Sequence, residues 1–65
     1  MNNNYKFVDE NSDVIYKVIS PNRVIPEKGQ RVIVRYKKYL VFRVDETIDF
    51  DRFAREITIY ITDLL

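Results

Sequence analysis

Residues 56–62 read Glu-Ile-Thr-Ile-Tyr-Ile-Thr, and apolar and polar side chains alternate along this stretch without a fault. Successive side chains of a β-strand point to opposite faces, so a period of two is typical of a strand buried on one face only. We therefore expect Ile57, Ile59 and Ile61 to face a core. Since this is the clearest pattern in the chain, it decides the fold class in favour of a sheet.

Two further extended segments are expected near the N-terminus. Residues 5–8 alternate, residues 10–13 form the turn cluster Glu-Asn-Ser-Asp, and residues 14–19 are rich in β-branched side chains. Strand-like runs separated by such a cluster predict a β-hairpin. Residues 1–4 are largely polar, and we expect them to be disordered. The remaining residues, 5–65, are expected to form one small β-domain.

The segment 20–29 holds both prolines and the only glycine of the chain, which predicts an irregular connection. Gly29 is expected to adopt a positive φ that other residues resist. Residues 26–34, Pro-Glu-Lys-Gly-Gln-Arg-Val-Ile-Val, resemble the entry into a central strand of SH3-like barrels. This resemblance covers under a sixth of the chain and implies architecture only, without function.

Residues 31–36 and 40–45 are expected to form a second hairpin, whose turn sets the register. A two-residue turn at Lys37 and Lys38 would need positive φ at both lysines, which is costly without Gly, Asn or Asp. We therefore predict a three-residue loop over residues 37–39. This register aligns an apolar face made of Val32, Val34, Tyr36, Leu40, Phe42 and Val44. The opposite face would hold Arg31, Ile33, Arg35, Val41 and Arg43.

Residues 46–55 admit two interpretations. Phe50, Phe53 and Ala54 have helical spacing, and Asp49 can cap a short helical turn near residues 49–55. The alternative is a wide hairpin loop in which the two phenylalanine rings close the end of the core. Both interpretations give Phe50 and Phe53 a structural role.

Five short strands in a hairpin-rich order predict an all-β fold: a small five-stranded antiparallel SH3-like barrel or a strongly bent sheet. A chain of 65 residues has a small core, and without cysteine it has no disulfide to support it. Stability must come from packing, and oligomerisation or binding to a partner is a reasonable expectation.

The composition excludes the commonest catalytic and metal chemistries. The chain has no histidine and no cysteine, so a Ser-His-Asp or Cys-His arrangement and a Cys/His zinc site are ruled out. One glycine cannot build a phosphate-binding loop. The acids Asp45, Glu46, Asp49 and Asp51 lack the spacing of a calcium loop. We expect no enzyme activity, no catalytic residue, no cofactor and no metal.

The sequence also bears on location and source. Residues 1–4 do not begin a signal peptide, and no apolar run is long enough to span a bilayer. We expect a cytoplasmic protein that does not contact membranes. Richness in Asn, Lys, Ile and Tyr indicates an AT-rich coding genome, such as that of a phage or another mobile element.

The charge distribution supplies the main candidate binding site. Net charge is only +1, yet residues 28–43 carry six cations and no acid. The expected contact residues on this basic hairpin are Arg31, Arg35, Lys37, Lys38, Tyr39 and Arg43. A simpler explanation is that such charges protect an edge hairpin from aggregation.

The expected function is non-catalytic binding of a macromolecule, first of all a protein, as a small accessory or inhibitory module. The alternative is a small nucleic-acid-binding barrel, in which the cations neutralise phosphates and Tyr36 or Tyr39 stacks on bases. The near-neutral total charge argues against the alternative, because proteins that bind nucleic acid are usually strongly basic.

An acidic surface is a second candidate. It consists of Asp45, Glu46, Asp49 and Asp51, which can imitate phosphates and compete for a basic groove of a partner protein. The simpler interpretation is a solvated loop whose charges are balanced by Arg52 and Arg55.

The last strand is a third candidate. Its outward face carries Tyr60 and Leu64 beside an uncovered Leu65. An exposed β-branched strand is a template for strand addition, so a homodimer through this strand is an alternative unless the N-terminal strand covers it.

Overall fold

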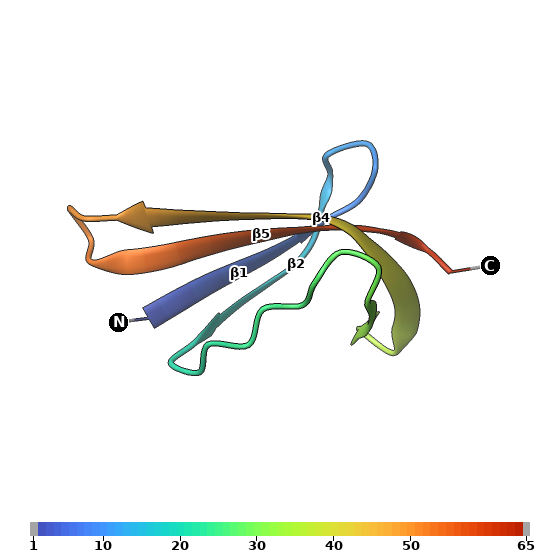
Figure 1. Cartoon of the computed structure of the whole chain (residues 1–65), viewed down its shortest axis with the longest axis horizontal. Helices are drawn as coiled ribbons and strands as arrows, with labels where there is room; N and C mark the ends of the chain where they lie inside the picture. The colour runs from blue at the N-terminus through green and yellow to red at the C-terminus, as the bar shows by residue number, and fades with distance from the viewer. Residues whose placement is uncertain (1, 65) are drawn as a thin grey trace.

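A computed structural model describes residues 2–64, which contain five strands and no helix. Met1 and Leu65 lie outside the described residues, and with them the predictions that Met1 is disordered and Leu65 uncovered. The strands are β1 (Asn2–Val8), β2 (Val14–Ser20), β3 (Arg31–Val34), β4 (Lys37–Asp49) and β5 (Ala54–Asp63). Figure 1 shows β4 and β5 as the long strands of the molecule. No helix capable of crossing a membrane occurs in residues 2–64.

All five strands join one sheet in the order β2-β1-β5-β4-β3. The all-β, strongly bent sheet is confirmed, but the purely antiparallel arrangement is wrong in one pairing, since β1 and β5 run parallel. The other three pairings are antiparallel. Hairpins force their two strands to be antiparallel, whereas the first and last strands are not joined by a turn and have no such constraint.

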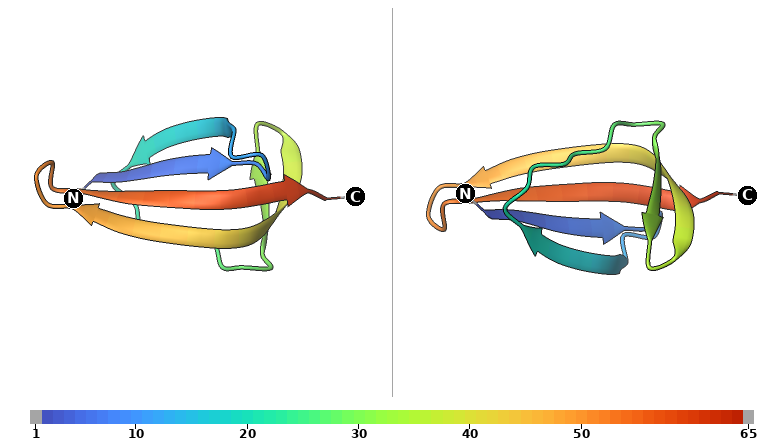
Figure 2. Two further views of the ribbon diagram at one scale, coloured as in Figure 1. Left: turned by 90° about the horizontal axis from the view of Figure 1, so that it is seen from above. Right: turned by 90° about the horizontal axis from the view of Figure 1, so that it is seen from below.

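The sheet curls into a half-barrel, and its concave face holds the core (Figure 2). The prediction for the last strand is confirmed, because Ile57, Ile59 and Ile61 are all fully buried. Burial of each of these side chains stabilises the fold by about 1.5–3 kcal/mol. Val41 and Tyr39 of β4 extend this cluster towards β3.

Residues 21–30 run without regular structure from the end of β2 to β3 and pass across one side of the sheet (Figure 2). Two side chains of β1 hold the beginning of this segment. The Asn3 side-chain amide donates to the carbonyls of Pro21 at 3.3 Å and Asn22 at 3.1 Å. The Tyr5 hydroxyl donates to the Asn22 carbonyl at 2.8 Å.

The other end of the segment is held by the backbone of β4. Gly29 has a φ of 91°, as its position in the loop predicts. Its N–H donates to the carbonyl of Val41 at 2.8 Å, and the Val41 N–H donates to the carbonyl of Gln30 at 2.9 Å. The irregular connection is therefore fixed at both ends.

Residues 2–4 differ from the disorder that their polarity predicts, because they form the start of β1. Asn3 is only 1% exposed. Its amide oxygen accepts a hydrogen bond from Arg55 Nη1 at 3.3 Å, in addition to the two bonds that its amide nitrogen donates. A buried asparagine is tolerated where its polar atoms find partners, and Asn3 meets that condition.

The register predicted for the second hairpin is wrong. The chain turns at Arg35 and Tyr36, which have φ values of 52° and 70°, and Val32 lies opposite Tyr39. The predicted three-residue loop avoided positive φ, but the observed turn accepts it at two bulky residues. In return Tyr39 enters the core beside Val34.

Further along β4, a bulge changes which side chains face inward. The register shifts between Val41 and Arg43, so Val41 is buried and Phe42 is 37% exposed. The sequence predicts the opposite for both residues. A bulge bends its strand, and this one lies where β4 curves towards β3 (Figure 1).

Residues 50–53 form a hairpin loop between β4 and β5, so the helical alternative is wrong. The structural role predicted for the two phenylalanines is also wrong, since Phe50 is 79% and Phe53 64% exposed. Asp49 organises the loop instead: its Oδ1 accepts the N–H of Asp51 at 3.0 Å and of Arg52 at 3.2 Å.

Candidate functional site

The turn between β3 and β4 is the most unusual piece of backbone in the molecule. Arg35 and Tyr36 both lie in the left-handed region, where two-residue hairpin turns normally place Asn and Gly. Such conformations cost about 1–3 kcal/mol at each non-glycine residue, and they gather at functional sites. The Tyr36 side chain is 102% exposed, so it contributes nothing to the core that would offset this strain.

Three neighbouring side chains extend this exposed surface. The pairing of Ile33 with Lys38 and of Arg31 with Leu40 places Arg31, Ile33 and Lys38 on the outward face of the hairpin. Ile33 is 70% exposed, although isoleucine normally belongs in a core. We call this surface the hairpin tip, and it consists of Arg31, Ile33, Arg35, Tyr36 and Lys38.

The cations of the hairpin tip form no ion pair within residues 2–64. Five ion pairs link side chains within residues 2–64, and Arg31, Arg35 and Lys38 take part in none of them. All three side chains belong to exposed residues. The tip therefore combines three unpaired positive charges with an aromatic and an aliphatic side chain.

Two of the predicted contact residues turn away from this surface. Lys37 Nζ lies 3.0 Å from Asp63 Oδ1, and this hydrogen bond, together with the carboxylate charge, raises the pKa of Lys37 above 10.5. The ammonium also lies 5.4 Å from the centre of the Tyr39 ring. Tyr39 itself is only 8% exposed and packs in the core, so it cannot serve as a contact residue in this structure.

The Arg43 side chain also makes its contacts within the chain. Its Nη2 lies 3.0 Å from Asp45 Oδ2, and its guanidinium carbon lies 5.1 Å from the centre of the Tyr60 ring. Of the six contact residues predicted from the sequence, the structure thus brings only Arg31, Arg35 and Lys38 together as an available surface.

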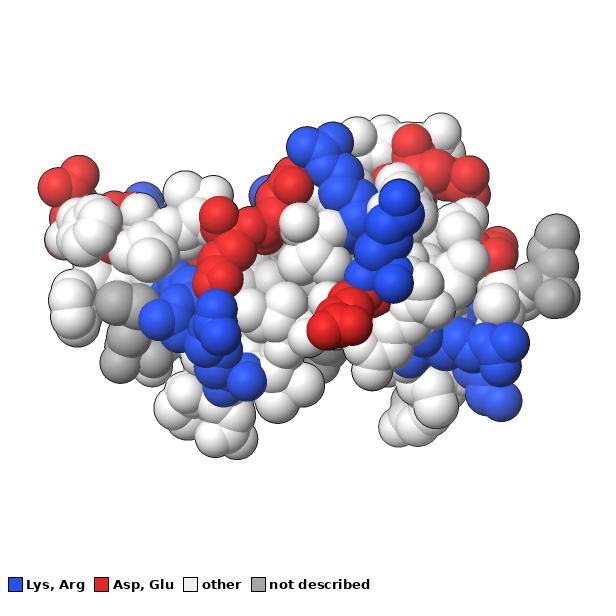
Figure 3. Space-filling view, viewed as in Figure 1, with Lys and Arg blue, Asp and Glu red and all other residues white. Residues whose placement is uncertain are grey.

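Charges of both signs alternate on the face of the molecule drawn in Figure 3, and they do not form one continuous basic patch. This distribution agrees with the net charge of +1. A large positive field that attracts any polyanion is therefore not a feature of this face.

The structure does not assemble the predicted acidic surface. Along β4, Asp45 and Glu46 are successive residues and point to opposite faces of the sheet. Glu46 accepts from Arg23 Nη2 at 2.7 and 2.8 Å and lies 3.7 Å from Arg55 Nε. Asp49 is occupied by the backbone of its own loop. Within residues 2–64, no three acidic side chains are grouped so as to hold a metal ion.

The last strand offers no free edge over most of its length. Residues 54–60 of β5 pair with β1 on one side and with β4 on the other. The N-terminal strand thus covers the side on which strand addition was expected.

Tyr36 is the site residue that the sequence analysis misplaced. The predicted register put it in the core, whereas it is the most exposed aromatic side chain described. A signal was present, since a two-residue turn at Arg35 and Tyr36 places Val32 opposite Tyr39, on the same face as Val34 and Val41.

Comparisons of the chain with protein-family models, with curated proteins and with solved structures find no significant match.

Proposed function

We propose that this protein is a non-catalytic binding module that contacts a protein partner through the hairpin tip. The observation that carries the proposal is Tyr36, an aromatic side chain fully exposed on a strained turn. Tyrosine and arginine are enriched among the residues that dominate binding energy at protein interfaces, and Arg35 is the neighbour of Tyr36 in the turn. A rigid hairpin presents both residues at a low cost in conformational entropy.

The composition of the hairpin tip supports a protein rather than a nucleic acid as the partner. Ile33 adds exposed aliphatic surface, which binds apolar pockets and gains nothing from phosphates. Of the five cations predicted as contact residues, only three are unpaired within residues 2–64, because Lys37 and Arg43 are paired with Asp63 and Asp45. A small accessory or inhibitory protein of the phage or mobile-element type would work in this way.

The test is capture of partners from lysate of the natural host with tagged protein, after nuclease treatment, followed by mass spectrometry. The wild-type protein and the variants Tyr36→Ala and Phe50→Ala are compared. Phe50 is the matched control, since it is also an exposed aromatic residue in a hairpin loop. We expect a discrete protein that is retained by wild type and Phe50→Ala and lost with Tyr36→Ala. Equal retention by both variants would contradict the proposal.

Nucleic acid is the second candidate, and the observation in its favour is the presence of three unpaired cations beside an exposed tyrosine. If the hairpin tip binds phosphates, Arg35→Glu should abolish binding of a single-stranded oligonucleotide. The logarithm of the affinity should then fall with the logarithm of the salt concentration, with a slope no steeper than about −2 for three phosphate contacts on a single strand. Affinity that does not depend on salt would exclude this mode.

A further inference from the structure

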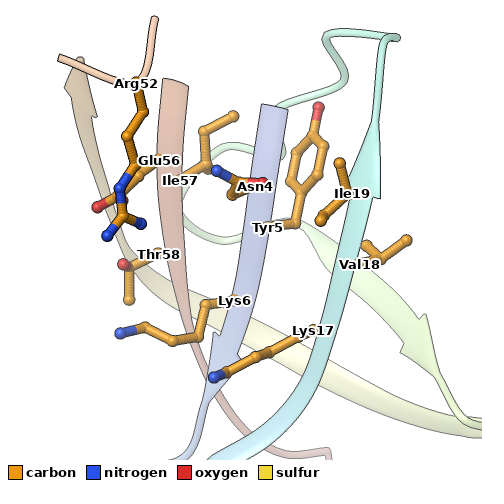
Figure 4. Close-up of a pocket in the computed structure, with 10 residues that line it drawn as sticks. All are labelled: Asn4, Tyr5, Lys6, Lys17, Val18, Ile19, Arg52, Glu56, Ile57 and Thr58. Atoms are coloured by element: carbon orange, nitrogen blue, oxygen red, sulfur yellow. The ribbon is translucent and has the colours of Figure 1, made fainter. Parts of the chain in front are cut away.

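A groove lies on the outer face of the sheet, opposite the core and away from the hairpin tip (Figure 4). It has a volume of about 600 Å³, and it is lined by residues of β1, β2 and β5 and of the loop before β5. Sites for small molecules commonly have volumes of about 300–1,000 Å³. Three cations line this groove, Lys6, Lys17 and Arg52, against a single carboxylate, Glu56.

Two of these cations lie directly opposite each other. Lys6 of β1 is paired with Lys17 of β2 in the ladder, and Figure 4 shows their side chains extending side by side. Like charges in this position destabilise a sheet. Neither lysine takes part in the ion pairs found within residues 2–64. No ion pair within residues 2–64 therefore offsets this repulsion.

The third cation reaches the groove from the loop between β4 and β5. The Oδ1 atom of Asp49 accepts a hydrogen bond from the backbone N–H of Arg52 at 3.2 Å. The other oxygen, Oδ2, lies 3.7 Å from Arg52 Nε. The next residue, Phe53, has a φ of 51°, so the chain turns sharply at this point. Figure 4 shows the Arg52 side chain lying along the outer face, with its guanidinium near Glu56 and Thr58.

A hydroxyl completes the row of donors. Thr58 of β5 is the neighbour of Lys6 on the side opposite Lys17, so the order across the sheet is Lys17, Lys6, Thr58. Arg52 approaches this row from the loop end of the groove (Figure 4). Two ammonium groups, a guanidinium and a hydroxyl are the donors that phosphate oxygens accept.

We propose that this groove binds a phosphate group, held by Lys6, Lys17, Arg52 and Thr58. A bound dianion would screen the repulsion between the two lysines, and the planar guanidinium of Arg52 matches the geometry of phosphate oxygens. The groove is larger than inorganic phosphate, so the organic part of a phosphate ester would lie against Asn4 and Ile19. This inference does not rest on the function proposed for the hairpin tip, because the two surfaces share no residue.

The first test follows backbone and side-chain NMR signals while sodium phosphate replaces sodium chloride at constant ionic strength and pH. We expect saturable shifts at Lys6, Lys17, Arg52 and Thr58. Lys6→Gln and Lys17→Gln should each weaken phosphate binding by roughly threefold to tenfold. Glu56→Gln should strengthen it, because the variant removes the only carboxylate that lines the groove. Lys28→Gln is the matched control and should leave phosphate binding unchanged, because Lys28 is an exposed lysine of the segment before β3 and lies outside both the groove and the hairpin tip.

The thermal stability of the same variants provides a second readout. Without phosphate, Lys6→Gln should raise Tm by about 1–4 °C, because it removes the repulsion from Lys17. When phosphate is present, the difference in Tm between Lys6→Gln and the wild-type protein should decrease, because bound phosphate stabilises the wild-type protein more. Shifts that do not saturate, or that appear equally in Lys28→Gln and Lys6→Gln, would overturn the proposal.

The source of the phosphate is distinguished by two further probes, phenyl phosphate and a twelve-residue oligothymidylate. Tighter binding of phenyl phosphate than of inorganic phosphate, with shifts at Ile19, would identify a small phosphate ester. Binding of the oligothymidylate that depends on Lys6 and Lys17 would identify the phosphates of a nucleic acid strand. Absence of binding for all three phosphate probes would refute the site.

Discussion

The Tyr5 hydroxyl accepts the backbone N–H of Val24 at 2.8 Å while it donates to the carbonyl of Asn22 at the same distance. One phenol on β1 thereby satisfies two backbone groups of the irregular segment that crosses the sheet. The aromatic ring of Tyr5 packs in the core, and the side chain is only 7% exposed. Tyr5 thus links the core to a connection that has no regular secondary structure of its own.

Tyr5→Phe should therefore destabilise the protein by about 1–3 kcal/mol, because the ring is kept while two hydrogen-bonding groups lose their partner. Urea unfolding followed by circular dichroism would measure the change. Tyr16→Phe is the control, since the Tyr16 side chain is 40% exposed and packs beside Phe7. Equal effects of the two substitutions would show that the hydroxyl of Tyr5 does not hold the segment.

Ile59→Ala should destabilise the protein by about 2–5 kcal/mol, because this side chain is fully buried at the centre of the concave face. Phe50→Ala should change stability by less than about 0.5 kcal/mol, although it deletes more atoms, because Phe50 is 79% exposed. Chemical denaturation of both variants measures the difference. A larger effect at Phe50 would mean that its ring closes the core after all.

The parts of the fold that could be predicted from sequence are those in which the local sequence pattern favours the same conformation as the tertiary contacts. The alternation around Ile57, Ile59 and Ile61 reflects burial on one face and gives the strand correctly. Gly29 adopts the positive φ that its place in a proline-rich loop implies. At these positions, the local sequence is enough to predict the backbone conformation.

The predictions were wrong where contacts between residues far apart in the sequence determine the conformation of a segment against its local preference. Avoidance of positive φ excluded a two-residue turn, but positive φ at Arg35 and Tyr36 places Tyr39 in the core beside Val34. The parallel pairing of β1 with β5 and the bulge beside Phe42 likewise depend on contacts far apart in the sequence. The wrong register of the second hairpin also affected the candidate site. The predicted contact residues include Tyr39, which is buried, in place of Tyr36, which is exposed.

The contact of Lys37 with Asp63 makes a prediction about pH. Its hydrogen bond and charge raise the pKa of Lys37 above 10.5, so the folded protein holds this proton more tightly than the unfolded chain does. The resulting stabilisation is fully present below pH 10.5 and is lost as the pH rises through the raised pKa. It is small, because both side chains are exposed to solvent.

An NMR titration of the Lys37 side chain at high pH measures this directly. In Asp63→Asn, the pKa of Lys37 should return towards 10.5, because the variant removes the carboxylate that raises it. A Lys37 pKa that is the same in Asp63→Asn and in the wild-type protein would show that the ion pair is not formed in solution.

The turn at Arg35 and Tyr36 links stability to the proposed function. Replacement of both residues, Arg35→Asn with Tyr36→Gly, supplies the pair that this turn type prefers and should stabilise the protein by about 1–3 kcal/mol. The same change removes the two side chains on which the proposed interface depends, so binding of the protein partner should be lost. Thermal unfolding and partner capture on one preparation measure both effects.

Phe53→Gly is the matched control, because Phe53 is another exposed aromatic residue with positive φ, at 51°. It should also gain stability through relief of strain, but partner binding should remain, since Phe53 lies in the loop between β4 and β5. Comparison of the double variant with this control therefore shows whether loss of partner binding follows from changing the turn at Arg35 and Tyr36 or from relief of backbone strain in general. If the double variant gains stability and still binds the partner, the strained turn has no role in binding, and the interface lies elsewhere on the sheet.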